Sequence, residues 1–97
     1  MITAIVTLET TAENMPKLTV LARATMHIFD KQEGFISKKL LQNEAGTKLV
    51  QIIEWESADA AMACMTSSDW QTQEALNFME FIASGRATMN PENYVTV

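Results

Sequence analysis

The chain has 97 residues, of which 47% are hydrophobic, and its formal net charge is −5 at pH 7. This length and composition predict one folded domain over residues 1–97 and exclude an intrinsically disordered chain. The negative charge argues against nucleic-acid binding, which needs a basic face, and no apolar run approaches the roughly 20 residues of a membrane span. Cys64 is the only cysteine, and no signal-peptide pattern precedes the first strand, so we expect a cytoplasmic protein without an intramolecular disulfide.

The first strand and the first helix are predicted from two different periodicities. Apolar and polar residues alternate from Ile2 to Glu9, which indicates a strand with one apolar face. A helix should begin between Thr11 and Met15, because Pro16 is tolerated only near a helix start, and should run to about Gln32. His27 falls opposite the apolar stripe, so we expect an exposed histidine rather than a general base or a metal ligand. The stripe itself comprises Met15, Leu18, Leu21, Ala22, Thr25, Ile28 and Phe29.

A β-hairpin is predicted next. Gly34 can end the helix in the left-handed conformation, and Phe35 to Asn43 alternates as a second strand. A short turn containing Gly46 leads to a third strand with apolar residues on both faces, Leu49, Ile53 and Trp55 against Val50 and Ile52. One layer of helices covers only one face of a sheet, so a second copy of the chain is the simplest cover for the other face.

The second helical region is predicted in two pieces. Ser57 can cap a helix over Ala58 to Met65, and the cluster Thr66–Asp69 can break and recap it. A second piece should run from about Trp70 to Ser84, with Gly85 as its C-cap and an apolar face formed by Ala75, Phe78, Met79 and Ile82. The last extended segment spans Arg86 to Asn90 and Asn93 to Val97, and the interruption at Pro91 suits a sheet edge.

The resulting order, β-α-β-β-α-β, is that of the ferredoxin-like α+β fold, an antiparallel sheet with both helices on one face. The chain has no Gly-rich phosphate loop, and one histidine and one cysteine cannot form a zinc or haem-attachment cluster. We therefore predict no metal and no cofactor. The remaining feature is an apolar space between sheet and helices, lined by aromatic and methionine side chains, which suits a flat hydrophobic molecule and equally an ordinary core.

Four short motifs, in order, resemble those of the antibiotic biosynthesis monooxygenase (ABM) family. They are Glu33-Gly34-Phe35 opening the second strand, Ile53 to Ser57 closing the third, Asp59-Ala60-Ala61, and Ser67 to Trp70. The resemblance implies a dimeric α/β barrel, in which two ferredoxin-like sheets pack face to face. It also implies oxidation of a phenolic or quinol-like substrate by dioxygen without metal or flavin.

The resemblance points to particular residues in such a site. Trp55 and Trp70 match aromatic positions of the family pattern and could stack on a ring, although Trp55 also suits the strand core. Asn77 could hydrogen-bond a substrate oxygen, with Trp70 the second candidate for a catalytic role. Tyr94 and Arg86 are the possible hydroxyl and cation partners. The haem-degrading branch is disfavoured, because no histidine lies between Ala58 and Val97.

The leading hypothesis is a homodimeric, cofactor-independent monooxygenase acting on an aromatic or quinol-like small molecule. The alternatives are a non-catalytic module that binds or sequesters a hydrophobic metabolite, and a structural dimer with a filled core.

Overall fold

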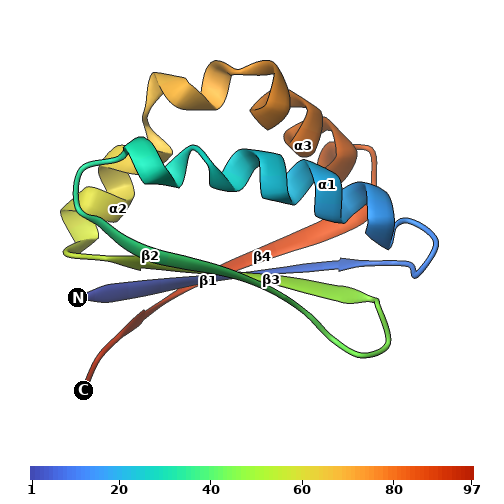
Figure 1. Cartoon of the computed structure of the whole chain (residues 1–97), viewed down its shortest axis with the longest axis horizontal. Helices are drawn as coiled ribbons and strands as arrows, with labels where there is room; N and C mark the ends of the chain where they lie inside the picture. Colours follow the sequence, from blue (N-terminus) through green and yellow to red (C-terminus); the bar gives the residue numbers. More distant parts are fainter.

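The computed structural model describes all residues from 1 to 97 and has the predicted order of strands and helices (Figure 1). The ferredoxin-like α+β fold is confirmed, with short 3₁₀ turns (η) added to the helical segments. The elements are β1 (Ile2–Thr10), α1 (Met15–Met26), η1 (Phe29–Lys31), β2 (Phe35–Gln42), β3 (Lys48–Trp55), α2 (Ala58–Met65), η2 (Ser68–Gln71), α3 (Gln73–Ala83) and β4 (Ala87–Val95).

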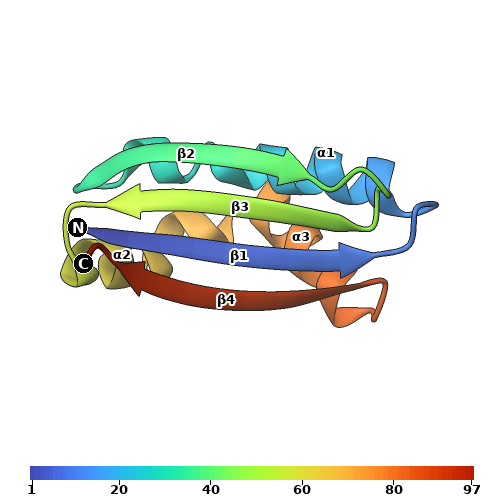
Figure 2. The same ribbon diagram turned by 90° about the horizontal axis from the view of Figure 1, so that it is seen from below.

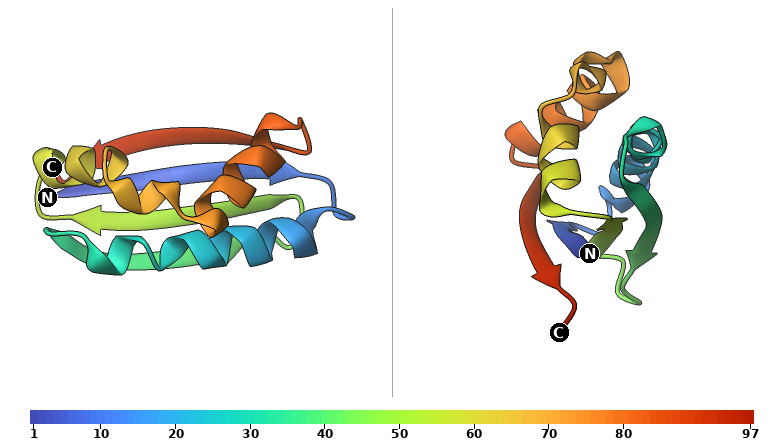
Figure 3. Two further views of the ribbon diagram at one scale, coloured as in Figure 1. Left: turned by 90° about the horizontal axis from the view of Figure 1, so that it is seen from above. Right: turned by 90° about the vertical axis from the view of Figure 1, so that its left-hand side faces the viewer.

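The four strands form one antiparallel sheet in the order β2-β3-β1-β4 (Figure 2). All helices lie on one face of this sheet, and the other face is open (Figure 1). In the helical layer, α1 and α3 lie beside one another across the sheet (Figure 3). The sheet of one chain does not close on itself. None of the helices combines the length and the hydrophobicity that crossing a membrane requires.

The alternation of β3 decides which side chains enter the core. Leu49, Ile53 and Trp55 point toward the helices and are 1%, 2% and 3% exposed, respectively. Val50 and Ile52, from the alternate positions, are only partly buried, because no helix covers the open face. The prediction of a strand with two apolar faces is therefore confirmed.

The first helix is shorter than predicted. Regular α1 ends at Met26, and η1 follows instead of further α-helical turns to Gln32. Side chains satisfy the carbonyls released there: the Nζ of Lys38 donates to the carbonyl of Met26 at 3.1 Å, and the Nε2 of Gln32 donates to that of Ile28 at 3.1 Å. Such bonds compensate for the lost helical hydrogen bonds.

The buried face of α3 also differs from the prediction. Ala75, Phe78 and Phe81 form it, each at most 3% exposed, whereas Met79 is 43% exposed. The helix is rotated so that Phe81 enters the core between α3 and the sheet. Two predicted caps are confirmed: Ser57 accepts from the N–H of Ala60 at 3.1 Å, and Gly85 follows α3 with a φ of +85°. Gly34 has a positive φ but does not cap a helix, because the η1 turn already ends before it.

The last strand is continuous where the sequence suggests a break. β4 runs through Pro91, which pairs with Val6 of β1. A proline is tolerated here because β4 is an edge strand, with a neighbour on one side only. The predicted position of this strand at a sheet edge is confirmed, and the predicted interruption at Pro91 is wrong.

Candidate functional site

Aromatic side chains contact one another between β3 and the helices, in the region where the sequence predicts a space for a ligand. Trp55 lies edge-on to Phe29 and Phe35, with ring centroids 6.1 and 6.0 Å apart. Trp70 lies edge-on to Phe29 at 5.9 Å. These rings belong to a buried cluster with Met26, Ile53 and Cys64. The expected apolar space is therefore occupied by core side chains in this part of the molecule.

The polar break after α2 directs Trp70 into this cluster. The Oγ of Ser67 accepts from the N–H of Asp69 at 3.1 Å and begins the η2 turn, and Thr72 then caps α3. The indole Nε1 of Trp70 donates to the carbonyl of Cys64 at 2.8 Å. Burial raises the pKa of the Cys64 thiol, so this cysteine is a neutral packing residue at physiological pH.

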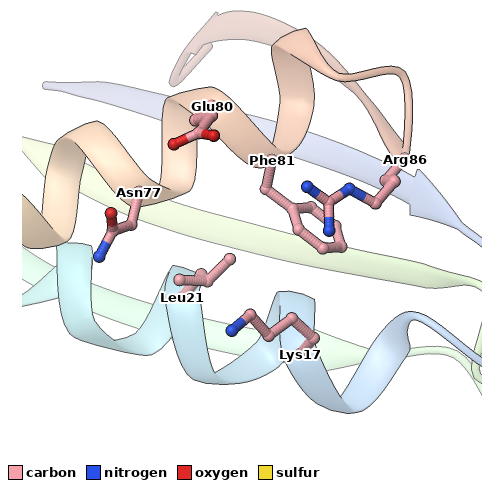
Figure 4. Close-up of a pocket in the computed structure, with 6 residues that line it drawn as sticks. All are labelled: Lys17, Leu21, Asn77, Glu80, Phe81 and Arg86. Carbon is pink, nitrogen blue, oxygen red and sulfur yellow. The ribbon is translucent and has the colours of Figure 1, made fainter.

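A hollow of about 260 Å³ opens between α1 and α3 (Figure 4). Two apolar side chains, Leu21 and Phe81, lie within it, and the charged and amide groups surround them. The lining residues are Lys17, Leu21, Asn77, Glu80, Phe81 and Arg86. This arrangement combines an apolar surface for a ring with donors for an oxygen atom.

The donors of this hollow are only partly engaged by the protein. The guanidinium of Arg86 lies 4.8 Å from the centre of the Phe81 ring, and its Nε donates to the Oγ of Ser84 at 2.9 Å. The terminal nitrogens of Arg86 are left for another partner. The Oδ1 of Asn77 accepts from Gln73 at 2.7 Å, which leaves its NH₂ group available. Lys17 forms no ion pair.

The structure distributes the predicted site residues over three places. Asn77 and Arg86 come together in the hollow, and Trp55 and Trp70 belong to the aromatic cluster. Tyr94 lies on the open face of the sheet, where it donates to the Oε2 of Glu92 at 2.6 Å. That hydrogen bond raises the pKa of Tyr94, so its hydroxyl keeps its proton. These five residues therefore do not form one site within a single chain.

Lys17 is one of the lining residues that the sequence analysis did not select as site residues, together with Leu21, Glu80 and Phe81. It lies on the polar face of α1, where a solvated lysine is the ordinary expectation. Lys17 and Asn77 are sixty positions apart in the chain, and they line the same hollow only because α1 packs against α3. The apolar periodicity of either helix alone does not predict this packing.

No group of three or more His, Cys, Asp or Glu side chains is placed to hold a metal ion. The side chain of His27 is 75% exposed, with its Nδ1 3.8 Å from an Asp30 oxygen, so the expectation of an exposed histidine is confirmed. Lys38 donates to the same carboxylate at 2.8 Å and lowers the pKa of Asp30. The interaction between Asp30 and Lys38 therefore links η1 to β2.

Three of the four sequence motifs meet at one corner of the fold. Gly34 has a φ of +83°, and a β-carbon at this position would lie 2.5 Å from the β-carbon of Ala60. The carbonyl of Gly34 accepts from the N–H of Glu56 at 2.8 Å. The Gly-Phe, Glu-Trp-Glu-Ser and Asp-Ala-Ala motifs thus allow β2, β3 and α2 to approach closely, which is a structural role.

The model of one family, described as antibiotic biosynthesis monooxygenase, matches residues 1–76. This match covers most of the chain and includes all four motifs. The chain belongs to the ABM family. No curated protein matches its sequence.

Several solved structures share the ABM fold of this chain at low sequence identity. Cofactor-independent oxygenase SnoaB from Streptomyces nogalater, in a mutant form, has 17% identity and a TM-score of 0.77, over 98% of this chain and 92% of its own. A provisionally named ABM protein from Nitrosomonas europaea has 15% identity and a TM-score of 0.79, over 100% and 99% of the two chains. Another, from Deinococcus radiodurans, has 12% identity and a TM-score of 0.76, over 100% and 93%. These likenesses establish the fold.

Proposed function

We propose that this ABM protein is a homodimeric, cofactor-independent monooxygenase of the cytoplasm that oxidises a small phenol or quinol with dioxygen. The observation that carries the proposal is the hollow between α1 and α3, in which two cations, an amide and one carboxylate, Glu80, surround an apolar surface, so that positive charge is in excess. Membership of the ABM family and the similar fold of SnoaB, which is described as a cofactor-independent oxygenase, support it.

The side chains of the hollow suit an electron-rich phenol. The ring would pack mainly on the partly buried Leu21, with only the small exposed part of Phe81 beside it, and its hydroxyl oxygen would face Lys17 and Arg86. These cations favour the phenolate over the neutral phenol, since an opposite charge nearby stabilises the ionised form. The NH₂ of Asn77 would donate to a second oxygen on the ring. A phenolate transfers electrons to dioxygen more readily than a phenol does, so binding the anion is the contribution of the protein.

The reaction balances without a cofactor. A hydroquinone and one dioxygen molecule give a hydroxyquinone and one water, with one oxygen atom in each product. All four electrons that dioxygen accepts come from the substrate, and a new carbon–oxygen bond replaces a ring carbon–hydrogen bond. The proton of the first hydroxyl passes to solvent when the phenolate binds.

The size of the hollow limits the substrate. A cavity of roughly 150 Å³ can hold a benzene molecule, so about 260 Å³ accommodates one ring or two fused rings. A larger polycyclic substrate would have to extend out of the hollow or separate the two helices. We therefore propose a monocyclic or bicyclic substrate.

The open face of the sheet supports the proposed dimer. Ile5, Val50 and Ile52 form an apolar centre there, with Leu41 of β2, which is 46% exposed, beside them. Polar side chains, including Glu54 and Ser37, lie toward one end of the face and bond to one another at 2.6 Å. An apolar centre with a polar margin is the arrangement expected of an interface between two copies.

Oxygen uptake by the purified protein, in the presence of a chelator and without flavin, tests the function. Monocyclic and bicyclic hydroquinones and catechols are the substrates to compare, and tricyclic anthrones test the proposed size limit. Asn77→Ala and Arg86→Gln should each reduce the rate by about tenfold or more, because each removes a hydrogen-bond donor to a substrate oxygen. Gln71→Ala and Lys48→Gln are the matched controls, an exposed amide and an exposed cation outside the hollow.

No uptake above the spontaneous rate with any substrate would contradict the proposal. If the same compounds nevertheless quenched tryptophan fluorescence saturably, a binding module would replace the oxygenase. Equal losses in the variants and their controls would remove the hollow as the site.

A further inference from the structure

A second concavity, of about 510 Å³, lies along the other half of α1, beside the start of α3. We name it the α1 groove. It shares no residue with the hollow described above. Its volume falls within the range of small-molecule sites, about 300 to 1,000 Å³, whereas the hollow is slightly smaller than that range. Apolar side chains from α1 and the turn after it form part of its surface: Val20, Ala24 and Ile28.

Three basic side chains follow the same groove at intervals of one helical turn. Arg23, His27 and Lys31 are four residues apart, which places successive groups about 6 Å apart along the helix. The chain as a whole carries a net charge of −5. A row of basic groups on an acidic protein concentrates positive potential at one place on the surface.

The neighbouring carboxylates leave this row positive. Asp30 faces His27 but is already paired with Lys38 at 2.8 Å. Glu74 lines the opposite side of the groove, and neither Arg23 nor Lys31 forms an ion pair with any residue. Two permanent positive charges therefore oppose one negative charge, beside an apolar strip.

An exposed apolar residue, Val20, lies at one end of the apolar strip formed by Val20, Ala24 and Ile28. Val20 is 66% exposed on the outer face of α1, so its side chain presents apolar surface at this end of the groove. A ligand that covered Val20 would bury apolar surface and place its charged group among the basic side chains.

We propose that the α1 groove binds an organic anion with an apolar body, such as an aromatic carboxylate or sulfonate. The apolar body lies mainly on Val20 and Ala24, with the small exposed part of Ile28 at the far end, and the anionic group lies between Arg23 and Lys31. This site is separate from the proposed oxygenase site, and it does not depend on that function.

A matched pair of fluorescent probes tests the proposal. The anionic probe is 8-anilinonaphthalene-1-sulfonate, and N-phenyl-1-naphthylamine has the same aromatic body without the sulfonate. At low ionic strength the anionic probe should bind saturably, and its affinity should fall as salt is added. The double variant Arg23→Gln/Lys31→Gln should weaken its binding about tenfold and change the binding of the neutral probe by less than about twofold.

Two further variants locate the probe. Val20→Ser should weaken both probes, because it removes apolar contact for the shared aromatic body. Lys48→Gln, an exposed cation on the sheet, should affect neither. Amide chemical-shift changes on titration should concentrate in residues 20–31 and 72–74. All of these substitutions are at exposed positions, so each variant is expected to keep the native circular dichroism spectrum.

Several results would overturn the proposal: no saturable binding of the anionic probe, equal affinity for both probes, or equal weakening by Lys48→Gln. Loss of binding in Arg86→Gln with retention in the double variant would place the anion in the hollow and also overturn it. Oxygen uptake can fail while probe binding succeeds, so the two proposals are tested separately.

Discussion

Replacing Trp70 with alanine should destabilise the protein, because the indole is part of the core and not only a surface available to a ligand. The ring lies edge-on to Phe29 at 5.9 Å, and its Nε1 donates to the carbonyl of Cys64 at 2.8 Å. A fully buried Trp→Ala change costs about 3–5 kcal/mol. Trp70 is only partly buried, so we expect about half of that loss, roughly 2 kcal/mol.

The hydrogen bond can be separated from the packing with a second variant. Trp70→Phe keeps one ring beside Phe29 and removes the donor together with the smaller part of the indole. The carbonyl of Cys64 also accepts from the N–H of Ser67 at 3.1 Å, so it is not left unpaired. The hydrogen bond contributes about 0.5–1 kcal/mol, so we expect this variant to cost at least that much and less than Trp70→Ala.

Urea denaturation at equilibrium measures both costs, as shifts of the midpoint at constant slope. A domain of this size has a total stability of about 5–15 kcal/mol, so a change of about 2 kcal/mol is readily resolved and leaves the protein folded. A loss below about 1 kcal/mol in Trp70→Ala would refute the structural role and return Trp70 to the candidates for ligand stacking.

Three other predictions follow from exposure, backbone geometry and charge. Ile52→Lys should prevent formation of the proposed dimer in light scattering and leave the monomer folded. Ile53→Lys, at a position 2% exposed, should instead unfold the chain by burying a charge, and a folded Ile53→Lys protein would contradict the assigned faces. Gly34→Ala should lower the stability several times more than Gly85→Ala. Both glycines have positive φ, which alone costs about 1–2 kcal/mol for alanine, but only at Gly34 would the added β-carbon meet a side chain, at 2.5 Å; equal losses in the two variants would exclude that contact. The pKa of Asp30 is lowered in the folded protein, so its ionised carboxylate stabilises the fold above the pKa of the unfolded carboxyl, about 3.9, and this contribution is lost as the pH falls through the folded pKa. Asp30→Asn should therefore lose less stability on acidification than the unchanged protein does, and an identical pH profile of the two proteins would argue against the ion pair.

Local patterns in the sequence were sufficient for the order of the elements. The alternation in β3 separated Ile52 from Ile53, and Ser57 and Gly34 marked boundaries through chemistry that acts within a few residues. The end of α1 was predicted too far along the chain, because the bond from Lys38 to the carbonyl of Met26 joins elements that are distant in sequence. The pattern of one sequence does not predict such a hydrogen bond between distant elements.

The candidate site was predicted only in part, for a related reason. Asn77 and Arg86 were selected as possible ligand contacts, and the structure places both in one hollow. Lys17 was missed because its place in that hollow depends on the packing of α1 against α3. The sequence could not show which aromatic residues pack in the core and which contact a ligand, because a tryptophan such as Trp55 offers the same large apolar ring for either role.

The most direct test of the proposed function is the fate of the oxygen atoms. A hydroquinone that the protein consumes would be incubated under ¹⁸O₂ in ordinary water, with a chelator present, and the hydroxyquinone analysed by mass spectrometry after a short reaction time. We predict one ¹⁸O atom in each hydroxyquinone molecule. The Asn77→Ala variant should form much less of this labelled hydroxyquinone, and the Gln71→Ala variant should form as much as the unchanged protein. A product without ¹⁸O would contradict the account, because its new oxygen would then have come from water and the protein would not be a monooxygenase.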